Sequence, residues 1–290
     1  MITVMQHQIT GSDGRPMLLD VTFGSAPHPQ KVIVFCHGFK GFKDWGHFPQ
    51  VATYFAGQGF VFVKFNFSHN GTTVKTPTLF SDPEAFGRNN LSREMEDLGL
   101  VTDWVTSELP NIIPSNVELD AQSVGLMGHS RGGGIAILHA AEDKRIGALA
   151  TWAAVSDFGS RVAAFDLQKL QKDGMVHVMN SRTGEQLPLY KQFLEDYLEN
   201  SERFRIDVAA SGLKIPVMFV HGTADESVPY SEMEALSRCC RHAQTLAIQG
   251  ADHTFGASHP LRGNKWPGDT GQVVQKTVAF FEKCMVGAKA

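Results

Sequence analysis

Residues 123–134 read SVGLMGHSRGGG and contain the pattern Gly-x-Ser-x-Gly, centred on Ser130. The apolar residues before the pattern predict a buried strand, and residues 131–142 have the spacing of a helix. Ser130 would then stand at a sharp strand-to-helix turn, which is the position of an exposed nucleophile. Gly128 and Gly132 lack side chains, so the strand and the helix can pack closely around that turn. The helix N-terminus adds partial positive charge where an oxyanion would form.

Strand and helix patterns alternate on both sides of this turn. Short, almost continuous apolar runs are typical of strands that are buried on both faces of a sheet. Their alternation with helical segments predicts an α/β fold, in which helices cover both faces of a parallel sheet. A hairpin over residues 3–23 precedes it. The predicted strands are 31–36, 60–65, 123–127, 147–155, 216–220 and 244–248, and the predicted helices are 48–56, 91–109, 131–142, 230–239 and 271–285.

The alternation breaks between residues 157 and 212, where the sequence is polar with scattered Phe and Leu. We interpret this segment as a small, mostly helical insertion that acts as a lid over the carboxyl edge of the sheet. Because the strand pattern resumes after it, the sequence predicts a single domain over residues 1–290 with the insertion inside it.

A serine nucleophile needs a base, and the base needs an acid that orients it. His253 lies directly after the last predicted strand, which places it at the same sheet edge as Ser130. Asp225 follows the strand before that and gives the chain order serine, acid, histidine. We predict Ser130, Asp225 and His253 as the catalytic residues. Glu226 and Asp157, which also follow strands, are the alternative acids.

An oxyanion is held by two backbone N–H groups. One is predicted at Arg131, the residue after the nucleophile, and the other at Phe39, in the loop after the strand 31–36. Gly38 and Gly41 allow that loop to turn tightly. Several aromatic residues follow strands or lie in loops at this edge and predict a pocket for apolar or aromatic acyl groups. Besides Phe39, they are Phe42, Trp45, Trp152, Phe158 and Phe255.

Composition narrows the classes of partner. The 290-residue chain has a formal net charge of −4, and its acidic and basic residues are mixed, so we expect no nucleic-acid partner. The N-terminal residues lack the apolar core of a signal peptide, and no run approaches the about 20 apolar residues of a membrane helix. The four cysteines show no metal-ligand spacing. We therefore expect a cytoplasmic protein that needs no metal or organic cofactor, and the sequence leaves the oligomeric state open.

The chain resembles the α/β-hydrolase superfamily over nearly its whole length, and in particular the bacterial esterases that are similar to dienelactone hydrolases, cinnamoyl esterases and serine aminopeptidases. The resemblance implies a largely parallel sheet of eight strands, with one antiparallel strand near the N-terminus, and an insertion that serves as a lid. Dienelactone hydrolases themselves use a cysteine nucleophile, whereas this chain has Ser130. The residues that carry the resemblance are Cys36-His37-Gly38-Phe39-Lys40-Gly41, Gly128-His129-Ser130-Arg131-Gly132-Gly133, His221-Gly222-Thr223-Ala224-Asp225 and Asp252-His253.

These residues predict a serine hydrolase that cleaves carboxylic esters of small molecules, with medium-sized or aromatic acyl groups, through an acyl-enzyme. Three alternatives use the same fold: a serine peptidase or amidase of the aminopeptidase-like group, a carbon–carbon bond hydrolase, and a ligand-binding protein without catalysis.

Overall fold

A computed structural model describes residues 1–180, 183–261, 263 and 266–286. Its centre is an eight-stranded sheet with the strand order β1-β2-β4-β3-β5-β6-β9-β10. β2 pairs antiparallel with β1 and β4, and the other neighbouring strands pair parallel, so the predicted sheet is confirmed. The strands are β1 (Thr3–Thr10), β2 (Pro16–Phe23), β3 (Gln30–Cys36), β4 (Val61–Phe65), β5 (Leu119–His129), β6 (Ile146–Trp152), β9 (Val217–Gly222) and β10 (Gln244–Ile248).

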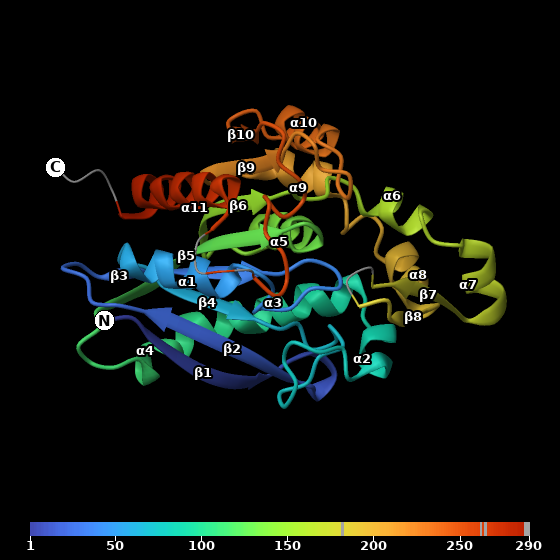
Figure 1. The fold of residues 1–290 in the computed structure, drawn as a ribbon, viewed down its shortest axis with the longest axis horizontal. Coiled ribbons are helices and arrows are strands. Elements are labelled where there is room, and N and C mark those ends of the chain that lie inside the picture. The colour runs from blue at the N-terminus through green and yellow to red at the C-terminus, as the bar shows by residue number, and fades with distance from the viewer. Residues whose placement is uncertain (181–182, 262, 264–265, 287–290) are drawn as a thin grey trace.

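Helices cover both faces of this sheet (Figure 1). One face carries α1 (Phe48–Gly57) and α11 (Gly268–Phe281), whose apolar side chains pack with those of the strands in one buried cluster. The other face carries α3, α5, α9 and α10 over a second, larger cluster. Their bounds are α3 (Leu91–Ser107), α5 (Arg131–Glu142), α9 (Ile206–Gly212) and α10 (Ser231–Cys239).

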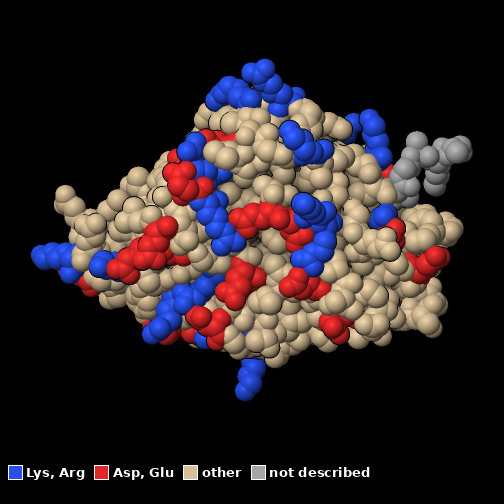
Figure 2. Space-filling model, turned by 180° about the vertical axis from the view of Figure 1, so that it is seen from behind, with Lys and Arg blue, Asp and Glu red and all other residues tan. Residues whose placement is uncertain are grey.

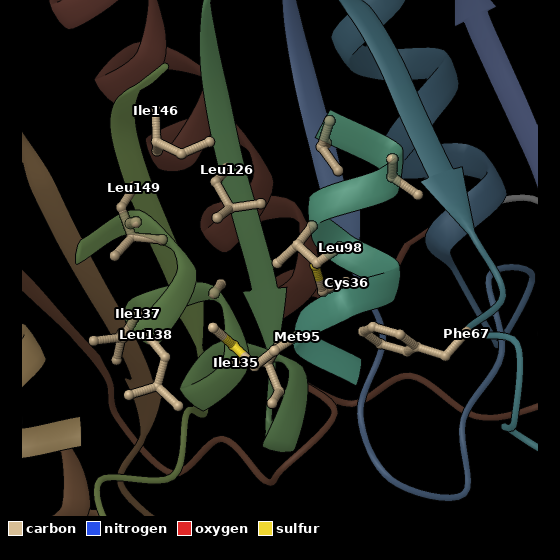
Figure 3. Close-up of a cluster of buried hydrophobic side chains, with 14 of the residues drawn as sticks. Cys36, Phe67, Met95, Leu98, Leu126, Ile135, Ile137, Leu138, Ile146 and Leu149 are labelled. Atoms are coloured by element: carbon tan, nitrogen blue, oxygen red, sulfur yellow. The ribbon is translucent and has the colours of Figure 1, made fainter. Parts of the chain in front are cut away.

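Strand β3 shows why its sequence is apolar without interruption. Ile33 and Phe35 point into the cluster under α1 and α11, whereas Val32 and Val34 point into the cluster under α3 and α5. Successive side chains of a strand face opposite sides, so a strand covered on both sides needs apolar residues at every position. Figure 3 shows part of the larger cluster, where side chains of α3, β5, α5 and β6 meet.

Short elements connect the main ones. They are η1 (Ser12–Gly14), α2 (Pro83–Gly87), α4 (Leu109–Ile112) and the π-helical turn η2 (Glu282–Val286). None of the described helices is long and apolar enough to cross a lipid bilayer. On the face shown in Figure 2, basic and acidic side chains are interspersed.

The segment 157–212 is mostly helical, as we predicted, but it also has a feature that the sequence analysis did not predict. It contains an antiparallel hairpin, in which His177 pairs with Pro188. Proline is excluded from central strands, but both strands of a hairpin are edges and tolerate it. The last helix, α9, packs against α5 in the larger apolar cluster and therefore belongs to the layer that covers the sheet. Before α9, the segment comprises α6 (Phe158–Ala163), α7 (Leu167–Asp173), β7 (Met175–Met179), β8 (Gln186–Tyr190) and α8 (Gln192–Glu199).

Candidate active site

Ser130 lies between β5 and α5 with φ 56° and ψ −123°, a backbone conformation that residues other than glycine rarely adopt. Its N–H donates to the Trp152 carbonyl at 2.9 Å. A Cβ atom on Gly128 would lie 2.3 Å from the Gly132 carbonyl oxygen, and one on Gly132 would lie 2.4 Å from the His37 carbonyl oxygen. Both glycines of the Gly-x-Ser-x-Gly pattern are therefore required by close backbone packing around the turn.

Asp225 and His253 come together at the same sheet edge. His253 Nδ1 donates to Asp225 Oδ2 at 2.7 Å, from the loop after β10 to the loop after β9. Asp225 Oδ1 accepts the backbone N–H groups of Ser227 at 2.9 Å and Val228 at 2.8 Å. His221 Nε2 lies 3.3 Å from Asp225 Oδ2 and donates to the Val228 carbonyl at 2.8 Å. Four groups, the His253 imidazole among them, thus hold the buried Asp225 carboxylate in a defined orientation.

The charge of Asp225 follows from these bonds. Burial alone would raise the pKa of Asp225, but hydrogen bonds from His221 and His253 hold this pKa well below its ordinary value. The carboxylate is therefore ionised at neutral pH and can only accept hydrogen bonds. His253 must then carry its proton on Nδ1, which leaves Nε2 as the basic nitrogen.

Ser130 and His253 line one cavity of about 660 Å³, whereas Asp225 lies buried behind it. The cavity wall is mostly apolar. Its apolar side chains come from the loop after β3, from α1 and α3, from the loops after β6 and β9, and from the insertion. They are Phe39, Trp45, Phe48, Leu91, Val155, Phe158, Val162, Ala164, Phe165, Phe193 and Val228.

The loop after β3 packs directly on the nucleophile. A Cβ atom on Gly38 would lie 2.9 Å from the Cβ of Ser130, so only glycine fits there. The Gly41 N–H closes a turn on the Gly38 carbonyl at 3.0 Å. Within the described ranges, the backbone N–H groups of Phe39 and Arg131 donate to no other protein group, which leaves both available to a bound oxygen.

Buried charges anchor this loop to the sheet. The Lys43 ammonium contacts Asp20 Oδ2 of β2 at 2.6 Å and Asp44 Oδ2 at 2.5 Å, and Lys64 of β4 contacts the same two carboxylates. His37 donates from Nδ1 to the Gly38 carbonyl at 2.9 Å. Burial lowers the pKa of His37 to about 4, so the ring stays neutral. These contacts fix the loop that carries Phe39.

His129 is a residue of the site that the sequence did not point to. Its Nε2 donates to the His253 carbonyl at 3.0 Å, and the two rings lie 4.7 Å apart. Burial, together with the nearby His253, lowers the pKa of His129 to about 3, so it acts as a neutral donor. His129 occupies the variable position before the nucleophile, where a sequence pattern carries no signal for its role.

The predicted aromatic lining needs correction at three positions. Trp45 and Phe158 line the cavity, as Phe39 does, but Phe42, Trp152 and Phe255 do not. Phe42 packs against Phe80, and Trp152 and Phe255 belong to the core under α1 and α11. Trp152 is the last residue of β6 and faces the core through the alternation of side chains along that strand. Phe42 and Phe255 lie in loops, where a prediction of strand position does not give the direction of a side chain.

The alternative acids lie elsewhere. Asp157 caps α6, since its Oδ1 accepts the Gly159 N–H at 2.8 Å and its Oδ2 accepts the Ser160 N–H at 3.0 Å. Glu226 is exposed. Among the described residues, no group of three or more His, Cys, Asp or Glu side chains is arranged to hold a metal ion.

Comparison with known proteins supports the fold. Residues 2–154 match the family model described as Chlorophyllase, and residues 104–263 match the model described as Serine hydrolase (FSH1). A relative from Escherichia coli, described as an uncharacterized 31.7 kDa protein in the traX-finO intergenic region, is 27% identical over 177 residues. The match covers 61% of this chain and 54% of the relative, so the chain spans about half the length of the curated relatives it matches.

Solved structures share the architecture at low identity. Est1E from Butyrivibrio proteoclasticus, with ferulic acid bound, has a TM-score of 0.73 at 18% identity, over 97% of this chain and 99% of that one. A puromycin-hydrolyzing peptidase from Mycobacterium tuberculosis has a TM-score of 0.66 at 16% identity, over 98% of this chain and 40% of that one. These likenesses are to the fold, and the two family models each cover more than half of the chain. The chain belongs to the α/β-hydrolase superfamily and, within it, to the serine hydrolases that the Chlorophyllase and FSH1 models describe.

Proposed function

We propose that this protein is a carboxylesterase in which Ser130 is the nucleophile, His253 the base and Asp225 the orienting acid. One observation carries the proposal: the His253 imidazole, which is bonded to Asp225, and the side chain of Ser130 both line a single cavity with a mostly apolar wall. A base that shares a cavity with a serine at a strand-to-helix turn is the arrangement that activates a hydroxyl group.

In the proposed reaction, Ser130 Oγ forms a bond to the acyl carbon while His253 Nε2 takes its proton. The backbone N–H groups of Phe39 and Arg131 stabilise the oxyanion. The ester C–O bond then breaks, and His253 gives its proton to the departing alcohol. Water, deprotonated by His253, attacks the acyl-enzyme; the bond between Ser130 Oγ and the acyl carbon breaks, His253 returns the proton to Ser130 Oγ, and the carboxylic acid is released. No step requires a metal or an organic cofactor.

The composition of the cavity wall favours esters with medium-sized or aromatic acyl groups as substrates, because its aromatic and aliphatic side chains shield an apolar acyl group from water. Est1E carries ferulic acid, an aromatic acid, on the same fold, which makes aromatic acyl groups the first substrates to test.

The charges of the wall favour an ester over an aminopeptidase substrate. Its charged side chains include Lys40, Arg131 and Arg161, and no Asp or Glu of the described chain lines the cavity. An aminopeptidase must bind the positive N-terminus of a peptide, which calls for a carboxylate in the pocket.

We expect the protein to hydrolyse p-nitrophenyl butyrate and an aryl cinnamate with a kcat/KM on the order of 10² or more above that for aminoacyl p-nitroanilides, because the pocket binds acyl groups and its described lining offers no carboxylate to an ammonium. Initial rates on both substrate series, measured by the release of p-nitrophenol or p-nitroaniline, check this. Since anilides are intrinsically less reactive, an N-acetylated anilide is the matched control. If the free aminoacyl anilide were cleaved much faster than its acetylated form, the peptidase assignment would replace ours.

The insertion is proposed to act as a lid that sets the choice of acyl group. Phe158, Phe165 and Phe193 reach the cavity from α6, from the turn after it and from α8. The Lys40 ammonium donates to the Met179 carbonyl of the hairpin at 2.8 Å, which links the loop after β3 to the insertion.

Phe165→Ala is expected to shift the preference between four-carbon and ten-carbon acyl groups by about tenfold, because contacts of this size are worth about 1–3 kcal/mol in an apolar site. Turnover of p-nitrophenyl acetate is expected to change far less. The measurement is a chain-length profile of kcat/KM from two to about ten carbons. Leu170→Ala is the control: Leu170 lies in the same insertion but is buried outside the cavity wall. Identical profiles for Phe165→Ala and the unmodified protein would mean that the insertion does not shape the pocket.

A further inference from the structure

The side chain of Arg131 lies almost buried beside the nucleophile, with 10% of its surface exposed. Its Nε donates to Oε2 of Glu94, on α3, at 3.0 Å, and Oε1 of Glu94 accepts the Asn89 side-chain N–H at 2.7 Å. Burial raises the pKa of Glu94, and the Arg131 guanidinium opposes this rise by favouring the ionised carboxylate. A charged pair is thus enclosed at the point where α5 begins.

Two aromatic rings contact this guanidinium. The Cζ atom of Arg131 is 4.9 Å from the ring centre of Phe39 and 5.0 Å from that of Phe193. A planar guanidinium is attracted to the face of an aromatic ring, and this attraction strengthens where water is excluded. Phe39 belongs to the loop after β3, and Phe193 belongs to α8 of the insertion. One side chain therefore contacts the helix α3, the proposed oxyanion loop and the insertion.

Each of these rings has a further aromatic neighbour. Phe39 lies 5.4 Å from Phe86, and Phe193 lies 5.8 Å from Phe165, measured between ring centres. A displacement of the guanidinium would therefore move two packed aromatic pairs rather than one free side chain.

Stability alone does not account for this arrangement. Apolar residues of similar volume stabilise a core as well as a buried ion pair does, because both charges lose their hydration. The pair is also incompletely satisfied: Nη2 of Arg131 is buried and has no hydrogen-bond partner among the described residues. A buried donor without a partner lowers stability. Arg145, by contrast, contacts both Asp143 and Asp103 far from the cavity.

We infer that the side chain of Arg131 is a positioning residue for the oxyanion hole. The backbone N–H of Arg131 is one of the two proposed oxyanion donors. The backbone N–H of Phe39 is the other, and the Phe39 ring lies against the Arg131 guanidinium. The ion pair with Glu94 fixes the guanidinium relative to α3, and the guanidinium fixes the Phe39 loop relative to α5. This inference rests on the proposed esterase function and deepens it.

The test uses Arg131→Lys and the double variant Arg131→Met/Glu94→Gln. Lysine keeps the positive charge beside Glu94 but has no planar face. The double variant removes both charges. Neither variant therefore leaves the buried Glu94 carboxylate unpaired, which would destabilise the fold. With p-nitrophenyl acetate, we expect both to lower kcat by about ten- to a hundredfold, the scale of a disturbed oxyanion donor. KM is expected to change by no more than about twofold, because ground-state contacts are retained. Thermal unfolding of the double variant is expected to stay close to that of the unmodified protein.

A second readout separates positioning from a general loss of structure. An aryl trifluoromethyl ketone adds to the serine and forms an oxyanion, whereas the product carboxylic acid does not. We expect the ketone to bind the variants more weakly by the same factor as kcat falls, and the product acid to bind unchanged. Arg145→Lys, a substitution in an ion pair remote from the cavity, is the matched control and is expected to leave both affinities and kcat unchanged.

Normal kcat and normal ketone affinity in the double variant would overturn the inference. So would a fall in kcat with unchanged affinity for the ketone. A different result would refute the esterase assignment itself: an unmodified protein that neither hydrolyses p-nitrophenyl acetate nor reacts with a fluorophosphonate at Ser130.

Discussion

Ser130→Ala is expected to lower kcat for p-nitrophenyl butyrate by a factor on the order of 10⁴ while the fold is retained. The hydroxyl oxygen is the only atom removed, so the acyl-enzyme cannot form. Stability is expected to change little, because alanine has the same Cβ atom beside Gly38 and experiences the same positive φ as the serine. Steady-state rates and thermal unfolding of both proteins measure the two effects.

A fluorophosphonate probe is expected to label the unmodified protein once, at Ser130, and to leave Ser130→Ala unlabelled. Ser211→Ala is a suitable control, because Ser211 is exposed on α9, where its hydroxyl donates to the Val208 carbonyl. Peptide mapping by mass spectrometry identifies the labelled serine. A label on another residue, or near-normal turnover by Ser130→Ala, would remove Ser130 as the nucleophile.

Asp225→Asn is expected to lower kcat by a factor on the order of 10³ to 10⁴. The ionised carboxylate accepts the Nδ1 proton of His253, whereas an asparagine amide can donate to Nδ1 and favour the wrong tautomer. The loss would appear in kcat with little change in KM, because Asp225 is buried behind the cavity and does not line it.

Asp157→Asn provides the matched comparison for the same chemical change. Asp157 caps α6 from an exposed position, and asparagine is an equally good helix cap, so turnover and thermal stability are expected to stay unchanged. Steady-state kinetics on the two variants decide between the candidate acids. Loss of activity in Asp157→Asn, with Asp225→Asn unaffected, would move the acid to the end of β6.

The parts of the fold that could be predicted are those in which one physical requirement acts on consecutive residues. Strands such as β3 are buried on both faces and so are apolar at every position, which makes them visible in the sequence. The turn at Ser130 is visible because backbone contacts at Gly128 and Gly132 exclude every side chain. Asp225 and His253 could be placed at the same edge as Ser130 because carboxyl ends of parallel strands share one edge.

The remainder depends on contacts between distant residues or on side-chain direction. The hairpin of β7 and β8 is short and includes Pro188, so we interpreted its residues as part of a mostly helical insertion. Trp152 ends β6 and faces the core because of a strand register that periodicity does not specify, and Phe255 reaches the same core from a turn after β10. The pairing of Arg131 with Glu94 joins residues 37 positions apart on different helices, and nothing local in the sequence marks it.

The backbone of Ser130 has a consequence for how this chain would drift in evolution. Its φ of 56° and ψ of −123° lie in a region that glycine enters freely and that costs other residues about 1–3 kcal/mol. A chain under selection for stability alone would therefore favour glycine at position 130. Serine persists there only while its hydroxyl is useful, so a lineage that no longer needed the reaction would be expected to lose this residue early and to gain stability by doing so.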